Sequence, residues 1–286
     1  MDFRTRYWHD PQARAAFKAF IRQIHGLDFT AWDAAGYWDD DYIPFSYFEG
    51  GRVVASLCLY TMPALVNGER CKVAQVSGVG TLPGYRRQGL NRQLHARALA
   101  WALQAHRFAF LYADENAFAF YRACGFRPID DFALVVDLPA SAGADVLQKV
   151  DVGLPVEREA IYRLACERTP ASHTFFTLNP KLVMFHLLYS APDDAWRVPG
   201  RDIVLLARRE PQRTVVYDIL ARELPAFDEL ASWIAPPQGG ECEFRFHTDR
   251  LNVPGARLKP LRGHDIHVMG SLALGAQPVF PFTAKA

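Results

Sequence analysis

The sequence predicts an α/β protein in which a mixed sheet carries helices against its faces. Three observations lead to this fold class. Residues 71–81 read as a strand, with clean polar–apolar alternation over residues 72–77. The hydrophobic period changes to that of a helix over residues 90–105, and residues 108–113 form a nearly all-apolar run of strand length. This strand, helix, strand order is typical of a sheet covered by helices.

The elements before this unit follow from local patterns. Residues 11–25 have apolar side chains at helical spacing, and Gly26 is well placed to end that helix. A loop rich in aromatic and acidic residues is expected over residues 29–42. Two strands then meet at Gly50-Gly51, which is a hairpin signal.

The elements after it complete a first domain. We expect a short helix over residues 117–124 and a strand over residues 132–138 that closes the unit. The small residues at 140–144 then indicate a boundary. The sequence therefore predicts one domain over residues 1–140 and a second, smaller α+β domain over residues 146–286.

The second half has a plan of its own. Its strands are expected at residues 202–208, 214–221 and 242–247, and its helices at residues 158–168, 180–189 and 226–234. This order echoes the first half, but residues 222–225, which lead from strand to helix, contain no glycine and have an acid in place of an arginine pair. Two interpretations stay open: a degenerate repeat that lacks a phosphate-binding turn, or an unrelated α+β cap.

Composition excludes several classes of protein. Because 32 Lys and Arg residues balance 31 Asp and Glu residues, we expect no extended nucleic-acid-binding surface. No apolar run approaches the roughly 20 residues of a membrane span, and the first residues lack the apolar core of a signal peptide. Five scattered cysteines without a C-x-x-C pair suggest neither a zinc ribbon nor a disulfide framework. We expect a cytoplasmic protein, and the sequence leaves a homodimer open.

The turn between the strand at 71–81 and the helix at 90–105 is the strongest chemical signal. It reads Pro-Gly-Tyr-Arg-Arg-Gln-Gly-Leu-Asn and ends at Asn91. A turn of this kind points unpaired N–H groups and the positive end of a helix dipole at one place, where a phosphate can bind. Gly89 would let the backbone approach such a ligand closely. Taken alone, the turn could equally be a surface loop with solvated arginines.

A second motif follows about thirty residues later, and the pair resembles the GNAT superfamily of acyl-CoA-dependent N-acyltransferases. The family's pyrophosphate loop, Arg/Gln-x-x-Gly-x-Gly/Ala, is matched by Arg86, Gly89 and Asn91, although Asn91 replaces the usual Gly or Ala. The family's later motif is an Asn before a short helix that carries Tyr and ends in Gly-Phe; it is matched by Asn116, Tyr121, Gly125 and Phe126. The resemblance covers about residues 45–137.

The resemblance implies a GNAT fold in the N-terminal half and acetyl-CoA, or another acyl-CoA, as co-substrate. The strand at 76–81 would separate from its neighbour and bind the pantetheine arm, with N–H groups near Val79 and Thr81 polarising the thioester carbonyl. The residues implied for the co-substrate are Val79, Thr81, Arg86, Arg87, Gln88, Gly89, Leu90, Asn91 and Asn116. The side chain of Asn91 would either crowd a phosphate oxygen or donate to it.

The resemblance also assigns a catalytic residue. Tyr121, protonated at neutral pH, would donate a proton to the departing CoA thiolate. Its alternative role is that of a packed aromatic beside Phe118 and Phe120. The base that accepts the amine proton stays unassigned: Asp114 and Glu115 are the nearest acids, but both could instead cap the following helix.

The acceptor site is expected in the aromatic and acidic loop before the sheet, at Trp38, Asp40 and Tyr42. Acids and aromatic rings together suit a cationic amine, although the same loop could be a solvated turn with buried rings. His264 and His267 lie three residues apart in an apparent strand, so they point to opposite faces and we expect no metal site.

These observations predict a transferase, an N-acetyltransferase acting by direct attack of a primary amine on acetyl-CoA. The acceptor would be a small molecule or a peptide amine. Two alternatives stay open: a non-catalytic acyl-CoA-binding sensor or interaction module, and a two-domain aminoacyl-tRNA-dependent transferase. The balanced charge and the intact phosphate turn count against the latter.

Overall fold

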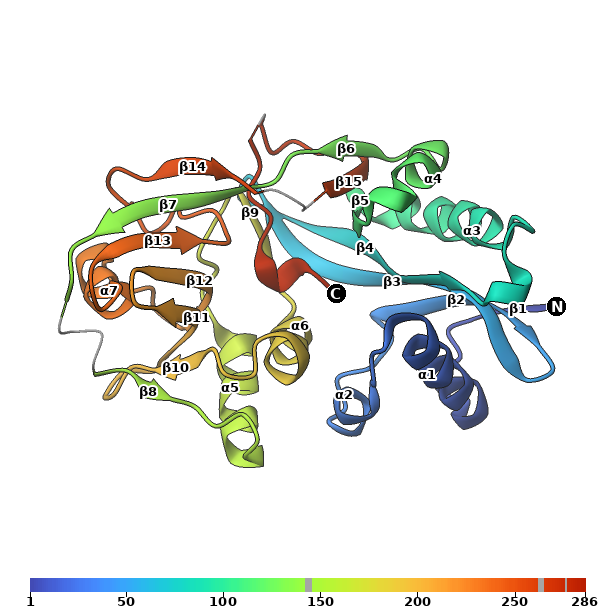
Figure 1. Ribbon diagram of the computed structural model, residues 1–286, viewed down its shortest axis with the longest axis horizontal. Helices are drawn as coiled ribbons and strands as arrows, with labels where there is room; N and C mark the ends of the chain where they lie inside the picture. Colours follow the sequence, from blue (N-terminus) through green and yellow to red (C-terminus); the bar gives the residue numbers. More distant parts are fainter. Residues whose placement is uncertain (142–145, 262–264, 276) are drawn as a thin grey trace.

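The computed structural model describes residues 1–141, 146–261, 265–275 and 277–286. The described residues form two mixed sheets with helices packed against them, and the C-terminus lies between the two (Figure 1). The mixed α/β fold expected from the sequence is confirmed. None of the helices in the described ranges has the length and apolar character needed to cross a bilayer.

The first sheet has eight strands. Their order is β1 (Asp2–Thr5), β2 (Tyr42–Glu49), β3 (Arg52–Val66), β4 (Glu69–Thr81), β5 (Phe108–Ala113), β15 (Asp265–Gly270) and β6 (Arg127–Ile129), with β9 (Phe175–Thr177) beside β3. Among these pairs β4 and β5 run parallel and the others run antiparallel.

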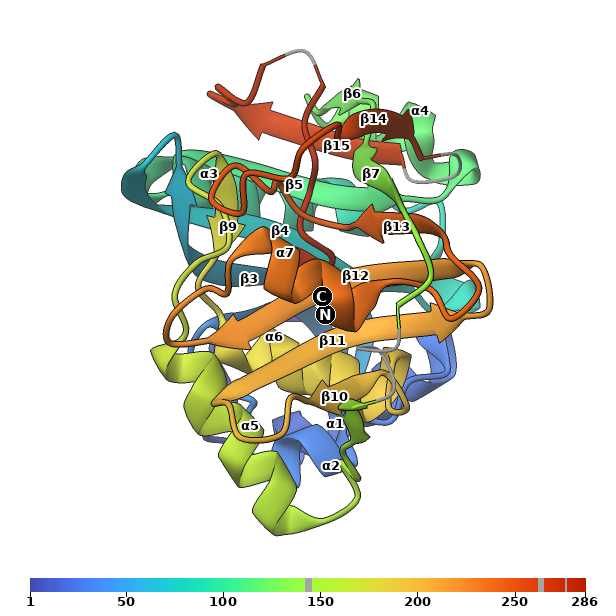
Figure 2. The same cartoon turned by 90° about the vertical axis from the view of Figure 1, so that its left-hand side faces the viewer.

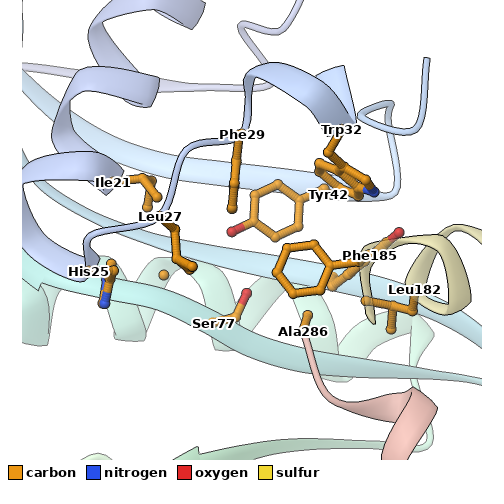
Figure 3. Close-up of a pocket in the computed structure, with 12 residues that line it drawn as sticks. Ile21, His25, Leu27, Phe29, Trp32, Tyr42, Ser77, Leu182, Phe185 and Ala286 are labelled. Atoms are coloured by element: carbon orange, nitrogen blue, oxygen red, sulfur yellow. The ribbon is translucent and has the colours of Figure 1, made fainter. Parts of the chain in front are cut away.

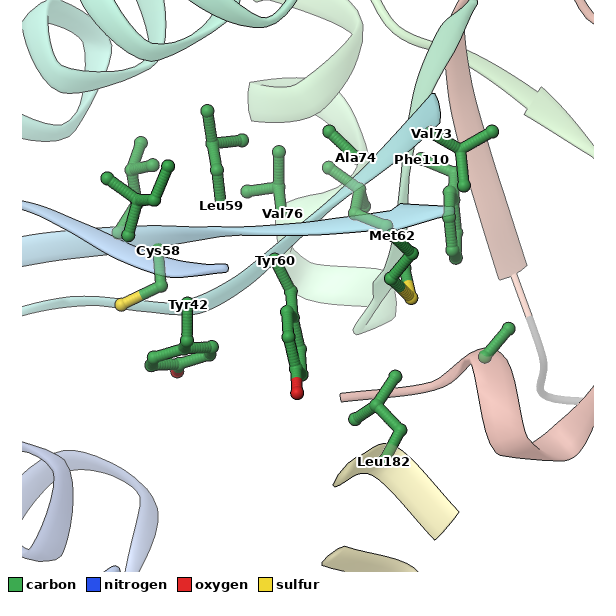
Figure 4. Packing of buried hydrophobic residues seen from close by; sticks show 14 of the residues in the cluster. Tyr42, Cys58, Leu59, Tyr60, Met62, Val73, Ala74, Val76, Phe110 and Leu182 are labelled. Carbon is green, nitrogen blue, oxygen red and sulfur yellow. The ribbon is translucent and has the colours of Figure 1, made fainter. Parts of the chain in front are cut away.

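Four helices cover this sheet. One face carries α1 (Pro11–His25) and α2 (Thr30–Ala34), and the other carries α3 (Leu90–Ala105) and α4 (Phe118–Ala123) (Figure 1). Both faces of the sheet are therefore packed with hydrophobic side chains: Tyr42 and Tyr60 point to one side, and Leu59 and Val76 point to the other (Figure 4).

The second sheet has seven strands. Their order is β14 (Arg257–Pro260), β7 (Phe132–Leu138), β13 (Gly240–Phe244), β12 (Arg213–Ala221), β11 (Ile203–Glu210), β10 (Ala195–Arg197) and β8 (Gln148–Lys149). Its helices are α5 (Pro155–Glu167), α6 (Pro180–Phe185), which continues into a π-helical turn, η4 (His186–Ser190), and α7 (Phe227–Ile234). Figure 2 shows this sheet in front of the first.

The two sheets share one connectivity and exchange strands. In each, an antiparallel pair (β3–β4 or β11–β12) is followed by a helix and a parallel strand. Beside that parallel strand lies a strand from the other half of the chain: β15 next to β5, and β7 next to β13. The second half therefore repeats the topology of the first.

The exchange corrects one expectation. Residues 132–138 form a strand, but this strand joins the second sheet and does not close the first. Its residues are mostly buried on both faces, and such an apolar run carries no local signal of which sheet it joins. The division into 1–140 and 146–286 thus stays a prediction, since strands from each half lie in both sheets. Residues 142–145 of the expected boundary lie outside the described residues.

Other elements differ from expectation at their bounds. The hairpin at Gly50-Gly51 is formed, by β2 and β3. The expected loop at 29–42 contains the short helix α2, and the expected helix at 180–189 is α6 with the π-helical turn after it.

Candidate active site

The site begins where the parallel pair of the first sheet separates. β4 and β5 pair only at Ala74 with Ala109 and at Gln75 with Phe110, and β4 then leaves its neighbour. This separation was implied by the family resemblance. It opens a cleft of about 930 Å³ between the end of α1, the second half of β4, the turn before α4 and the C-terminal residues.

A β-bulge lies in the separated part of β4. Ser56 pairs with Gly80 and Cys58 with Ser77, so that Gly78 and Val79 both stand opposite the one residue between, Leu57. Gly78 has a φ of +57°, a conformation that favours glycine. A bulge of this kind changes the direction of the backbone groups of the strand, and Gly78, Val79 and Thr81 all line the cleft.

The end of α1 is held close to this bulge. Asp10 caps the helix by accepting from the N–H groups of Gln12 and Ala13. A β-carbon at Gly80 would lie 2.7 Å from Cγ2 of Ile24, so the absence of a side chain there lets α1 pack directly on β4. This close packing places His25, the last residue of α1, beside the cleft.

The glycine-arginine turn connects β4 to α3. Gly89 is the N-cap residue of α3 with a φ of 74°, and its carbonyl accepts from the N–H of Gln93 at 3.1 Å. The N–H groups of the residues before Gln93 in the first turn have no acceptor within the helix, and the helix dipole is positive there. This end of the cleft can therefore hold an anion, with Arg86 in its wall.

The predicted turn residues do not all face the cleft. Arg86 and Asn91 line it, whereas the neighbouring Arg87, Gln88, Gly89 and Leu90 lie outside its lining. Of these four, Leu90 is buried in the hydrophobic core and the other three are exposed.

Asn91 ties the turn to β4. Its Nδ2 donates to the carbonyl of Gly80 at 2.7 Å and to Oγ1 of Thr81 at 2.6 Å. The amide N–H₂ is therefore engaged with the protein. Its Oδ1 is buried and has no hydrogen-bond partner within the described residues.

Tyr121 and Asn116 lie on the opposite wall. Tyr121 is on α4, packed against Phe126 and His95, and also lines the cleft. Burial, with a smaller contribution from Asp114, raises the pKa of Tyr121 to about 12, so the hydroxyl stays protonated throughout the neutral range. Asn116 lies on the 3-10 turn η2 (Glu115–Ala117), also in the cleft lining.

Asp114 is the N-cap residue of that turn, but its side chain makes no capping hydrogen bond. The expected capping role is therefore not filled by this carboxylate, which lines the cleft instead. Its charge raises the pKa of both Tyr121 and His25.

His25 was not singled out from the sequence. Partial burial lowers its pKa below the usual 6.5, against a hydrogen bond with the backbone of Gly78 and the charge of Asp114, which both raise it. The ring is still exposed to solvent at the cleft, so a neutral, accessible imidazole lies beside the bulge. The only sequence signal was its position at the end of an amphipathic helix.

A smaller cavity of about 140 Å³ adjoins the cleft and shares His25, Ser77, Gly78 and Ala286 with it. Its wall is aromatic and aliphatic, and Figure 3 shows the rings of Phe29, Tyr42 and Phe185 turned toward one another around it.

The three predicted acceptor residues are placed apart. Tyr42 lines the small cavity. Trp38 is buried against Phe17 and Phe29 in the aromatic core. Asp40 is exposed and lines a separate depression near Lys72.

The C-terminal residues complete the cleft. The backbone N–H of Ala286 donates to Oε1 of Gln75 at 2.7 Å, at the last pair between β4 and β5. Lys285 lies over the ring of Tyr112, and burial lowers the pKa of its ammonium group. No local sequence signal connects these residues with β4, more than two hundred positions earlier.

No cluster of three metal-ligating side chains is found within the residues that the structure describes. His267 is buried on β15 and lies next to the ring of Phe118. His264 lies outside the described residues.

Comparison with known proteins agrees with this geometry. Residues 16–129 match a family model described as an acetyltransferase (GNAT) domain. None of the curated proteins matches the sequence.

Several solved structures share the whole fold. One is a probable N-acyltransferase from Enterococcus faecalis, with a TM-score of 0.61 and 14% identity over 94% of this chain and 72% of that one. Another is Eis1 from Mycobacterium abscessus, with a TM-score of 0.58 and 19% identity over 94% and 73%. A putative acetyltransferase from Pyrococcus horikoshii has a TM-score of 0.52 and 11% identity over 99% and 96%. At these identities the likeness shows the fold.

Proposed function

We propose that this protein transfers the acetyl group of acetyl-CoA to a primary amine by direct attack, and the match of residues 16–129 to the model of an acetyltransferase (GNAT) domain supports this proposal. The observation that carries the proposal is the cleft itself. It brings the anion-binding turn, the bulged strand β4 and Tyr121 onto one continuous surface.

The residues present fit the co-substrate. The first turn of α3 and Arg86 suit a pyrophosphate, and the separated edge of β4 has unpaired backbone groups for the pantetheine arm. Asn116 would orient the arm from the opposite wall. The co-substrate supplies an acyl thioester, and we assign its carbonyl oxygen to the N–H groups near Val79 and Thr81.

We assign His25 as the base. A primary alkylamine is mostly protonated at neutral pH and must lose a proton before or during attack. His25 is neutral there because partial burial lowers its pKa, and it lies where the cleft meets the small cavity. Asp114 stabilises the imidazolium that forms.

Tyr121 acts on the leaving group. As the new C–N bond forms and the C–S bond breaks, negative charge develops on sulfur. The buried hydroxyl of Tyr121 donates a hydrogen bond and then a proton to it. The proton taken by His25 returns to solvent, and the second proton lost by the amine nitrogen restores the hydroxyl of Tyr121, so that the products are the N-acetylated amine, the CoA thiol and one released proton.

The free thiols fit the location expected from the sequence. All five cysteines are unpaired, which suits the reducing cytoplasm, where we place the protein.

The proposal is tested by incubating the purified protein with acetyl-CoA and a panel of primary amines and measuring free thiol. We expect thiol release that depends on the amine, and a loss of about 100-fold in kcat for Tyr121→Phe. The control is Tyr162→Phe, which removes a hydroxyl from α5, outside the cleft. Unchanged turnover in Tyr121→Phe removes this residue from the acid role. Tight CoA binding without turnover on any amine favours a non-catalytic sensor instead.

A further inference from the structure

The small cavity beside the cleft has the dimensions of a single ring. Its volume of about 140 Å³ is enclosed mainly by Ile21, Phe29, Trp32, Tyr42, Leu182 and Phe185. An apolar cavity of about 150 Å³ in another protein stays dry and binds benzene. A phenyl ring or a compact branched alkyl group therefore fits this space.

The side chains that the structure describes in the wall of the cavity are mostly apolar, and none of them carries a carboxylate. Its titratable side chains are His25, Tyr42 and Tyr60, and burial raises the pKa of both tyrosines, which keeps them neutral. The terminal residue Ala286 lies at the end that the cavity shares with the cleft. The nearest acids of the surrounding loop are already paired: Asp33 with Arg14 and Lys18, and Asp39 with Lys181. A buried ammonium group without a partner is strongly unfavourable.

The polar groups of the cavity are gathered at one end. His25, Ser77, Gly78 and Ala286 line both the cavity and the cleft, so they mark the opening between the two. A molecule that fills the cavity with an apolar group would present a polar end at this opening. That end would lie beside the bulge of β4 and within the reach of His25.

Resting on the proposed function, we propose that this cavity binds the body of the acceptor. The acceptor is then a primary amine whose nitrogen is joined, through one or two methylene groups, to a ring-sized apolar group. Polyamines and amino sugars carry further charges, and we expect them to be poorer acceptors because a second charge placed deep in the cavity would be desolvated among apolar side chains.

The second half of the chain has a defined part in this site. Leu182 and Phe185 of α6 close the cavity. Their position is fixed by hydrogen bonds from the N–H of Trp32 to the hydroxyl of Tyr189 at 3.1 Å and from the hydroxyl of Tyr60 to Asn179 at 3.5 Å. We therefore assign to the second half the role of shaping acceptor specificity.

The alternative occupant is a long acyl chain on CoA. An acyl chain in the cavity would pass through the opening at His25 and Ser77 and block it. The amine would then have to approach from the part of the cleft that the pantetheine arm occupies. For this reason we assign the cavity to the acceptor.

The test compares 2-phenylethylamine, ethylamine and 1,4-diaminobutane as acceptors for acetyl-CoA. We expect kcat/KM for 2-phenylethylamine to exceed that for each of the other two at least about tenfold, as for other apolar specificity pockets. Equal or lower values for 2-phenylethylamine, with ethylamine still acetylated, overturn the inference and leave the proposed function standing. Failure to bind CoA or to acetylate any amine overturns the proposed function itself.

Two variants test whether the acceptor preference arises in the small cavity. Phe185→Trp reduces the space in the cavity, and we expect the ratio of kcat/KM for 2-phenylethylamine to that for ethylamine to fall about tenfold. Leu27→Asp places a carboxylate at the exposed lip of the cavity and should shift preference toward 1,4-diaminobutane. Its control is Leu103→Asp, the same change at a similarly exposed leucine of α3, 42% exposed against 36% for Leu27.

Further measurements distinguish the occupants. If hexanoyl-CoA is the better donor and Phe185→Trp abolishes that preference, the cavity holds the acyl chain and the inference is wrong. If Leu27→Asp and Leu103→Asp change the acceptor preference equally, the lip plays no part and the inference is again wrong. Thermal unfolding of each variant separates loss of fold from loss of specificity, because Leu27 is exposed and its replacement leaves the core intact.

Discussion

The two sheets of this protein share one connectivity, but they differ at the gap, the space where the two strands of the parallel pair separate. This gap is open in the first sheet and filled in the second. In the first sheet β4 leaves β5 after two pairs and a cleft opens. In the second sheet β12 pairs with β13 from Arg213 to Val216, and the protein itself fills the space that follows. The same topology thus leaves an open cleft beside one sheet and a filled core beside the other.

The filling of the second gap is specific. The ring of Tyr217 stacks on Phe282 at 4.2 Å between centroids. Next to it, Asp218 forms a buried ion pair with Arg168 and accepts from Oγ1 of Thr283 at 2.8 Å. Arg168 directly follows α5, just as His25 ends α1 at the first gap. A residue that faces the open cleft in one half therefore has a counterpart that neutralises a buried charge in the other.

The first turns of α3 and α7, the helices that follow the two gaps, differ as well. The second and third residues of α3 are Asn91 and Arg92, and those of α7 are Asp228 and Glu229. Carboxylates in a first turn satisfy the positive end of the helix and repel a bound anion. The comparison teaches that the proposed phosphate site depends on a few residues at a helix start, whereas the sheet beneath it is common to both halves.

The largest expected effect comes from removing the buried ion pair that fills the gap of the second sheet. Asp218→Asn leaves the guanidinium of Arg168 buried without a charged partner. We expect the free energy of unfolding to fall by about 3–5 kcal/mol, as is typical when one member of a buried pair is removed. Chemical denaturation followed by circular dichroism measures the loss.

The matched control is Asp202→Asn. Asp202 pairs with Arg222 on the surface of the same half, where both side chains are more than half exposed. An exposed pair of this kind contributes about 0–1 kcal/mol. Similar losses in the two variants would show that the second gap is not a buried core, and the comparison between the sheets would fail.

The next prediction concerns the catalytic activity that we assign to His25, at the open gap of the first sheet. For His25→Gln we expect kcat/KM to fall by about 100-fold, because the base is lost. In the unchanged protein kcat/KM should decline as the pH falls through the pKa of His25, which partial burial places below 6.5, since only the neutral imidazole accepts a proton. This acidic limb should vanish in His25→Gln and persist in His173→Gln, an exposed histidine of the second half. A limb that survives in His25→Gln assigns the base to another group.

Local patterns in the sequence predicted much of the first sheet. Alternation located the strands, and the change to helical period located α3. The order of the two motifs indicated the GNAT fold, which the structure confirms. The structure also brings Arg86, Asn91, Asn116 and Tyr121 to one cleft, because all four lie in the segments that follow the carboxyl ends of the parallel strands β4 and β5.

The rest depends on pairing between distant segments. The exchange of β7 and β15 joins strands that each look like generic buried strands, and nothing local states their partner. Leu182 and Phe185 reach the small cavity from the second half, and Ala286 reaches Gln75 from the end of the chain. Trp38 and Asp40 share a loop with Tyr42 but diverge from it, because one turns into the core and the other to solvent.

The smallest expected effect comes from changing the charge in the first turn of α3 and of α7. Arg92→Glu gives the first turn of α3 the acid that α7 has at Glu229, and we expect KM for acetyl-CoA to rise about tenfold, through the loss of favourable charge at the helix start. The rise should shrink at high ionic strength, since salt screens exposed charges. Arg97→Glu, with the same charge change farther along α3, should alter KM much less. The reciprocal Glu229→Arg should leave CoA binding at one molecule per chain, because Arg168 and Asp218 still fill the second gap. If Arg92→Glu and Arg97→Glu raise KM equally, general charge governs CoA binding, and the first turn of α3 has no special part in it.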